Sequence, residues 1–155
     1  MDNKNSRGLI QMKKNIQEIA TELCDKFLDK GFVVQRYDAY STQSIYIKLD
    51  YGVSNTIRLS DHKGYDHLSY KYNIRLDIKQ DYVEKDKNGY IRYYIAPQNI
   101  DSFIQHTIRE RDTKIRRIGL LKYKEWMKRK YDVNNETPGF WSKCKEIRRK
   151  SNGTK

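Results

Sequence analysis

The chain has 155 residues, the length of one ordinary domain, and a formal net charge of +12 from 32 Lys and Arg against 20 Asp and Glu. It holds no apolar run near the roughly 20 residues of a membrane span and no secretory signal at its start, which predicts a cytoplasmic protein without a membrane partner. Its two cysteines are too few for a disulfide framework or a zinc site of four cysteines. We expect a single domain over residues 1–150 and a frayed tail over 151–155.

The first predicted element is an amphipathic helix over residues 8–30. Its apolar residues, among them Ile16, Leu23 and Phe27, recur every three or four residues and therefore fall on one helical face. Gly31 suits the left-handed position that follows a helix end, so the helix is expected to stop there.

The next part of the chain predicts strands, because it alternates in polarity and is rich in β-branched and aromatic residues. Ile45 and Ile47 would face one side of a sheet, and Tyr46 and Lys48 the other. Short connections between the first strands favour antiparallel hairpins. The predicted strands cover residues 32–40, 44–51, 55–61, 70–78 and 89–96, with 79–86 as a candidate partner of the last.

Pro97 opens a second helical region, whose apolar stripe runs to about residue 118. Gly119 is expected to kink it before an apolar face continues to about residue 130, and a last short helix is expected over 140–149. This order predicts an α+β fold with an N-terminal helix, an antiparallel meander of four or five strands, and C-terminal basic helices packed on one face of the sheet.

The positive charge is concentrated in the predicted C-terminal helices. Residues 1–105 carry 16 basic and 14 acidic residues, whereas residues 106–155 carry 16 basic and 6 acidic ones. This asymmetry favours an anionic partner, although a solvated helix face is the simpler alternative. The candidate partner-binding residues of these helices are Arg109, Arg116, Arg117, Lys122 and Lys124. Most of the 13 tyrosines lie in the strand region, where they would stack bases, bind a protein or fill the core.

Two Asp-His pairs lie five residues apart in the segment 60–67. Two imidazoles and two carboxylates on one loop are a potential site for a divalent cation. A polar turn explains the same residues, with Asp61 as a turn former. We expect no metal or other cofactor here, and assign His62, Tyr65 and His67 to partner binding.

A second acidic pattern, Asp77-Ile78-Lys79, is typical of metal-dependent nucleases when it lies on a strand near other carboxylates such as Asp61 and Asp66. Strand alternation by itself would place Asp77 and Lys79 on a solvent face, so the pattern stays a hypothesis. The chain has no fingerprint for acyl transfer, nucleotide hydrolysis or hydride transfer.

Three strand segments carry a resemblance to a known group of proteins. They are Ser44-Ile-Tyr-Ile, Asn55-Thr-Ile-Arg-Leu-Ser-Asp-His62 and Tyr70-Lys-Tyr-Asn-Ile-Arg75. Together they resemble small proteins of Gram-positive phages and mobile elements, which include anti-CRISPR proteins that inhibit the Cas9 nuclease. The resemblance implies a non-enzymatic inhibitor in the bacterial cytoplasm whose partner is a Cas9-type effector with its guide RNA. It defines no catalytic residue.

The net charge bears on how such an inhibitor would act. A chain of +12 does not suit the acidic imitation of DNA that blocks a PAM-binding groove. The mobile HNH nuclease domain, whose docking gates cleavage, is therefore the preferred target. Two alternatives stay open: a basic nucleic-acid-binding regulator of a phage or mobile element, and a small Mg²⁺-dependent nuclease that uses Asp61, Asp66 and Asp77.

Overall fold

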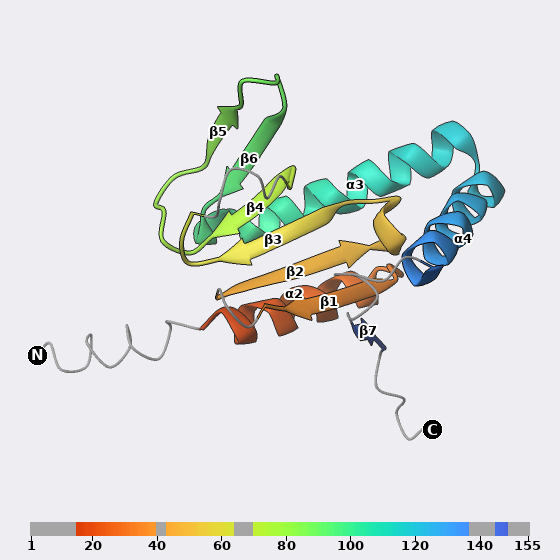
Figure 1. Ribbon diagram of the computed structural model, residues 1–155, viewed down its shortest axis with the longest axis horizontal. Coiled ribbons are helices and arrows are strands. Elements are labelled where there is room, and N and C mark those ends of the chain that lie inside the picture. The colour runs from red at the N-terminus through yellow and green to blue at the C-terminus, as the bar shows by residue number, and fades with distance from the viewer. Residues whose placement is uncertain (1–14, 40–42, 64–69, 137–144, 149–155) are drawn as a thin grey trace, which may run out of the picture.

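The structure is a computed structural model that describes residues 15–39, 43–63, 70–136 and 145–148 (Figure 1). It is an α+β fold in which, within these residues, two helices cover one face of a seven-stranded sheet and a third lies at the end of the sheet. No helix of the described ranges is long and apolar enough to cross a membrane.

The first described helix is α2, Ile16–Asp29. Asn15 and Glu18 form a reciprocal capping box, in which each side chain accepts a hydrogen bond from the other residue's backbone N–H, at 2.8 and 3.1 Å. Gly31 adopts the left-handed φ of +85° that the sequence predicted just beyond the helix. The predicted helix is confirmed over α2, but one continuous helix over 8–30 is wrong, because Asn15 is an extended N-cap with ψ 172°. Residues 8–14 of that prediction lie outside the described residues.

The sheet is mixed, and its strand order is β5-β6-β4-β3-β2-β1-β7. β1, β2 and β3 pair antiparallel as predicted, but β4 lies parallel to both β3 and β6, so the predicted meander is wrong beyond β3. Alternation identifies strands without identifying their neighbours, and the connection over 61–71 is long enough for the chain to return and pair in parallel. The strands are β1 Val34–Asp38, β2 Ser44–Leu49, β3 Thr56–Ser60, β4 Tyr72–Arg75, β5 Tyr82–Lys85, β6 Ile91–Ile95 and β7 Lys145–Ile147.

Two short strands lie at the sheet edges. β5 pairs antiparallel with β6, which confirms the expected partner within 79–86. β7 pairs antiparallel with β1, so the prediction of a helix over 140–149 is wrong at Lys145–Ile147, which form this strand. The backbone groups on the free side of β1 are satisfied by β7, and this tertiary pairing outweighs the helical pattern of a short polar segment.

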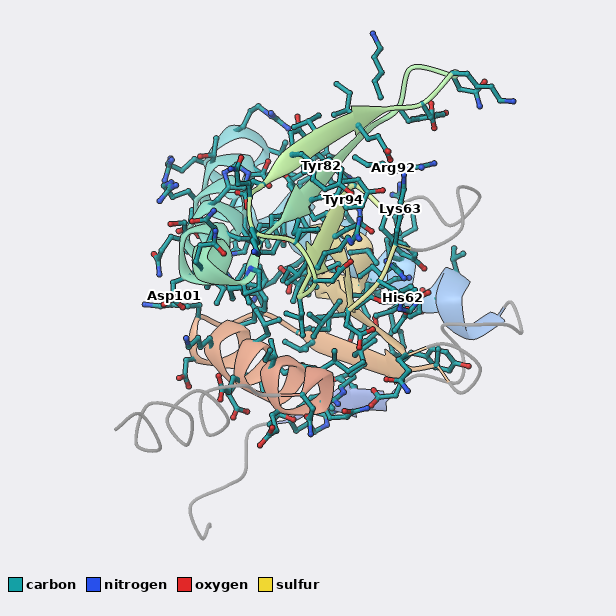
Figure 2. The ribbon with its side chains drawn as sticks, turned by 90° about the vertical axis from the view of Figure 1, so that its left-hand side faces the viewer. His62, Lys63, Tyr82, Arg92, Tyr94 and Asp101 are labelled. Atoms are coloured by element: carbon teal, nitrogen blue, oxygen red, sulfur yellow. The ribbon has the colours of Figure 1, made fainter. Side chains whose placement is uncertain are left out.

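The two faces of the sheet differ in chemistry. Alternate residues such as Ile47, Ile57 and Ile74 form the core with Phe27 of α2 and Phe103. The opposite face is polar yet largely buried. Its buried residues include Ser44, Tyr46, Lys48, Arg58, Ser60, Asn73, Arg75, Arg92 and Tyr94. Figure 2 shows Tyr82, Tyr94 and Arg92 gathered toward the β5–β6 end, where the Tyr82 and Tyr94 rings stack with centroids 4.5 Å apart.

The basic helices follow a one-turn 3-10 helix, η2 (Pro97–Asn99). They are α3, Ile100–Ile118, and α4, Leu120–Glu136. Gly119 separates them with φ +92° and ψ 148°, which confirms the predicted break.

The two basic helices pack differently. α3 lies on the same face of the sheet as α2 and buries Phe103, Ile104 and Thr107. α4 instead lies at the end of the sheet, against the 3-10 turn η1 (Asp50–Gly52) that joins β2 to β3 (Figure 1). The prediction that both helices pack on one face is therefore right for α3 and wrong for α4. The apolar residues at the start of α4 are not core, since Leu121 is 82% exposed.

Candidate functional site

A groove of about 520 Å³ runs along α3 and is strongly basic, since five Lys and Arg residues line it against one carboxylate, Glu110. We call it the basic groove. His106, Glu110, Lys114 and Arg117 form one stripe of α3, because residues three or four apart share a helix face. The groove is lined by Val53, Ser54, Asn55, Lys71, His106, Arg109, Glu110, Arg111, Thr113, Lys114 and Arg117.

The carboxylate in the basic groove is already occupied. Glu110 accepts hydrogen bonds from Asn55 Nδ2 at 3.0 Å and from the Tyr72 hydroxyl at 3.2 Å, and its Oε1 lies 3.4 Å from His106 Nε2. Burial, with the charge of Glu110 beside it, raises the pKa of Tyr72, so this hydroxyl stays protonated and donates. Glu110 is therefore held by neutral donors and by His106, and not by the cations of the groove.

The cations of the groove are largely free. Lys114 Nζ donates to the Val53 carbonyl oxygen at 2.8 Å and stays a structural contact. Lys71, Arg109 and Arg117 are exposed, and none of them forms an ion pair with a carboxylate of the described residues. Three unpaired cations around a concave surface create a positive potential that attracts anions.

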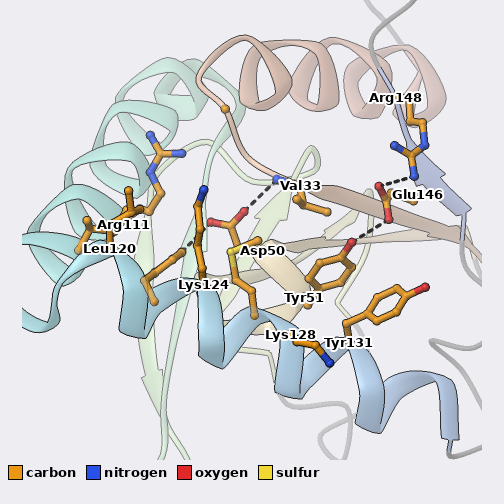
Figure 3. A pocket seen from close by; sticks show the side chains of 14 residues that line it. Val33, Asp50, Tyr51, Arg111, Leu120, Lys124, Lys128, Tyr131, Glu146 and Arg148 are labelled. Carbon is orange, nitrogen blue, oxygen red and sulfur yellow. Dashed lines mark hydrogen bonds and ion pairs between the residues drawn. The ribbon is translucent and has the colours of Figure 1, made fainter.

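A second cavity of about 710 Å³, the α4 pocket, lies between α4, η1 and β7 (Figure 3). At its floor, Asp50 Oδ1 accepts from the Val33 N–H at 2.8 Å and Oδ2 from the Tyr123 hydroxyl at 2.6 Å. Burial raises the pKa of Asp50, and these two hydrogen bonds oppose that shift. At the other end, the Tyr51 hydroxyl donates to Glu146 at 3.0 Å, which ties η1 to β7.

The rim of the α4 pocket is basic. Arg111 lies over the Phe32 ring at 4.0 Å, and Lys128 and Arg148 pair with Asp132 and Glu146 respectively, each at 3.2 Å. Lys124 lines the pocket and forms no ion pair with a described residue. This cavity therefore offers one free cation, fewer than the basic groove does.

A third cavity of about 640 Å³, the tyrosine pocket, lies where α3 meets β5 and β6. Tyr72 and Tyr93 stack in it with ring centroids 5.5 Å apart and planes 27° apart. It is lined by Lys71, Tyr72, Asp81, Tyr82, Val83, Tyr93, Tyr94, Ile95, Asn99, Ser102, Phe103, His106 and Glu110.

The structure divides the predicted helix residues among these surfaces. Arg109 and Arg117 line the basic groove, and Lys124 lines the α4 pocket. Arg116 and Lys122 are exposed and line none of the three cavities. Arg116 donates to Thr113 Oγ1 at 3.2 Å on its own helix.

The predicted loop residues lie elsewhere. Figure 2 shows His62 on the opposite side of the sheet from α3, so the structure does not bring it together with the basic groove. His62 Nδ1 lies 3.0 Å from Ser60 Oγ and 3.1 Å from Asp61 Oδ1. One ring nitrogen thus contacts both neighbours, unlike a nucleophilic triad, where the two nitrogens are divided between serine and carboxylate. Tyr65 and His67 lie outside the described residues.

The nuclease pattern is not on a strand. β4 ends at Arg75, so the strand predicted over 70–78 is too long and Asp77 follows it in a turn. The Arg75 guanidinium contacts both carboxylate oxygens of Asp77, and this hydrogen bonding lowers the pKa of Asp77. The described residues contain no group of three or more His, Cys, Asp or Glu side chains placed to hold a metal ion.

Sequence reasoning missed the contribution of Lys71, and it named the strand tyrosines only as a group, without separating Tyr72 and Tyr93 from the others. Lys71 comes just before β4 and joins the basic groove only because β4 lies parallel to β3, which places it beside α3. The spacing of His106, Glu110 and Arg117 was the available signal that one stripe of α3 stays open.

Comparison with known proteins found no matching family model, no matching curated protein and no matching solved structure.

Proposed function

We propose that this protein is a non-enzymatic binding protein whose basic groove engages an anionic partner. The observation that carries the proposal is the set of three exposed cations, Lys71, Arg109 and Arg117, without a carboxylate partner among the described residues. Cations that are not needed for folding contacts are free to pair with a ligand, and Arg presents a fork that matches phosphate and carboxylate groups.

We further propose that the partner is a Cas9-type effector loaded with guide RNA, and that binding blocks DNA cleavage. The resemblance of residues 44–75 to phage proteins that include Cas9 inhibitors supports this choice. The preferred contact is an acidic face of the HNH nuclease domain, with the guide RNA as a second anionic surface. The net charge of +12 supports a mechanism other than imitation of DNA.

The test is a pull-down of purified Cas9–guide complexes on the immobilised full chain, followed by DNA-binding and cleavage assays on the same sample. We expect the effector to be captured with or without target DNA, and to bind DNA at saturating inhibitor while cleavage is lost. Failure to capture any effector contradicts the Cas9 assignment. Loss of DNA binding at saturation contradicts the HNH mechanism and points to occlusion of the PAM or guide.

A second candidate, a regulator that binds nucleic acid directly, is favoured by the same three cations. If Lys71, Arg109 and Arg117 each neutralise one phosphate of a duplex, log K should fall with log salt with a slope of roughly −3. Tight binding of naked duplex with this slope, together with no capture of the effector, would select this function over the first.

A further inference from the structure

We propose that the tyrosine pocket and the basic groove form one continuous binding site for single-stranded nucleic acid. An unpaired base would enter the tyrosine pocket, and the neighbouring phosphates would lie along the basic groove. The inference rests on the proposed function for the anion-binding role of the groove. It nevertheless concerns a naked strand, so it is tested without any effector protein.

The two cavities adjoin, because Lys71, His106 and Glu110 line both of them. Lys71 marks the junction: its Nζ lies 5.2 Å from the centroid of the Tyr72 ring, which belongs to the tyrosine pocket. A ligand with a flat apolar part and an anionic part attached to it matches this arrangement. A nucleotide unit within a strand has that composition.

The accessible ring surface of the tyrosine pocket belongs to Tyr93, which is half-buried, and to His106, because Tyr72 is only 5% exposed. In the sheet register Val83 lies opposite Tyr93, and Tyr93 opposite Tyr72, so the three side chains form one row on the helix-facing side. The row extends to the sheet edge, where Val83 is 59% exposed. The His106 ring lies 5.9 Å from that of Tyr72 and its side chain is 45% exposed. Bases stack on such rings with little dependence on sequence.

The distribution of charge favours a nucleic acid over an acidic peptide. The tyrosine pocket contains Asp81 beside Asn99 and Ser102. Of the three free cations only Lys71, at the junction, also lines this pocket, whereas Arg109 and Arg117 lie in the basic groove alone. Asp81 Oδ1 already accepts hydrogen bonds from the Ala96 N–H and from Asn99 Nδ2, at 2.7 and 3.0 Å, which leaves Oδ2 as the acceptor for an N–H group on a base edge. A carboxylate of a peptide would be repelled at the same place. In a duplex the base faces are stacked and the edges paired, so only an unpaired base can fill the pocket.

The test is fluorescence anisotropy with the full chain and a labelled, mixed-sequence strand of about 12 nucleotides, as DNA and as RNA, beside the duplex of the same sequence. Tyr93→Leu removes the stacking ring but keeps an apolar side chain, and Lys71→Glu reverses the charge at the junction. The matched controls are Tyr90→Leu and Lys87→Glu, both at exposed positions of the β5–β6 turn outside the two cavities.

We expect the wild-type chain to bind the single strand at least about tenfold more tightly than the duplex. Each site variant should weaken single-strand binding by about tenfold, which for Tyr93→Leu is the effect of losing one stacked base. The controls should stay within about twofold. Tyr93→Leu should leave the weaker duplex binding unchanged, because a misfolded variant would lose duplex binding as well. Lys71→Glu tests the site independently if Tyr93→Leu destabilises the fold.

Equal affinity for strand and duplex, or no effect of Lys71→Glu beyond that of Lys87→Glu, overturns the inference. So does the absence of oligonucleotide binding at low salt. Capture and inhibition of the effector by a chain that binds no single strand overturns this inference and leaves the proposed function standing. Single-strand binding without effector capture contradicts the Cas9 assignment and leaves this inference standing.

Discussion

The Tyr123 hydroxyl donates a 2.6 Å hydrogen bond to Oδ2 of Asp50. Both side chains are buried, each residue being 2% exposed, and Asp50 Oδ1 accepts from the Val33 N–H. Tyr123 is the most deeply buried residue that the structure describes in α4, where Trp126 and Met127 are half-buried and Leu120 and Leu121 are exposed. The contact between Tyr123 and Asp50 therefore anchors α4 to the sheet and shapes the floor of the α4 pocket.

Replacing Tyr123 by Phe should destabilise the protein by about 1–3 kcal/mol, because a buried carboxylate would lose one of its two donors. Tyr131→Phe on the same helix is the matched control, as Tyr131 is 45% exposed and should change the free energy of unfolding by less than about 0.5 kcal/mol. Urea unfolding measures both. Equal stability of Tyr123→Phe and the wild-type chain would show that the contact does not anchor α4.

The ion pair between Arg75 and Asp77 should make stability depend on pH. Hydrogen bonding from Arg75 lowers the pKa of Asp77 below its ordinary value of 3.8. The ion pair therefore stabilises the fold above pH 3.8, and this contribution is lost as the pH falls through the lowered pKa. Asp77→Asn should therefore cost about 0.5–1 kcal/mol at neutral pH, because the Asp77 side chain is 34% exposed and partly screened.

The measurement is urea unfolding of the wild-type chain and Asp77→Asn at neutral pH and at a pH well below 3.8. The difference between them should shrink at the lower pH. Asp101→Asn is the control, since Asp101 and its partner Lys26 are both highly exposed, and it should show no such dependence. A difference for Asp77→Asn that is the same at both pH values would contradict the assignment.

Cys24 should be inert in the folded protein. It is buried at 2% exposure on α2, and burial raises the pKa of its thiol to about 12. The thiolate is the reactive form, so both access and ionisation are unfavourable. In a Cys144→Ser variant, where Cys24 is the remaining thiol, iodoacetamide should modify the unfolded chain and leave the native one unmodified. Rapid labelling under native conditions would show that α2 opens readily.

Local patterns predicted the elements better than their arrangement. Gly31 and Gly119 act through their own backbone, so the end of α2 and the break between α3 and α4 could be read from neighbouring residues. The start of α2 was not predicted, because Asn15, its N-cap, lies inside the helix expected over residues 8–30. The parallel pairing of β4 and the pairing of β7 with β1 are decided by residues far apart in the chain, which periodicity does not identify.

The candidate site shows the same division. Composition indicated a basic helix, but not which of two adjacent arginines lies in a groove. The structure places Arg117 in the basic groove and leaves Arg116 outside it, bonded to Thr113. His62, which the sequence grouped with these residues, contacts Ser60 on the other side of the sheet. Charge counts do not contain this information, because it depends on the rotation of α3 against the sheet.

The most direct test of the proposed binding surface compares Arg117→Glu with Arg116→Glu in affinity for the Cas9–guide complex. Both residues are exposed in the last turn of α3 and both substitutions change the charge equally, but only Arg117 lines the basic groove. We expect Arg117→Glu to weaken binding by about tenfold or more and Arg116→Glu by less than about threefold, with unchanged thermal midpoints. Equal effects of the two substitutions, or no effect of either, would contradict the claim that the basic groove is the contact surface.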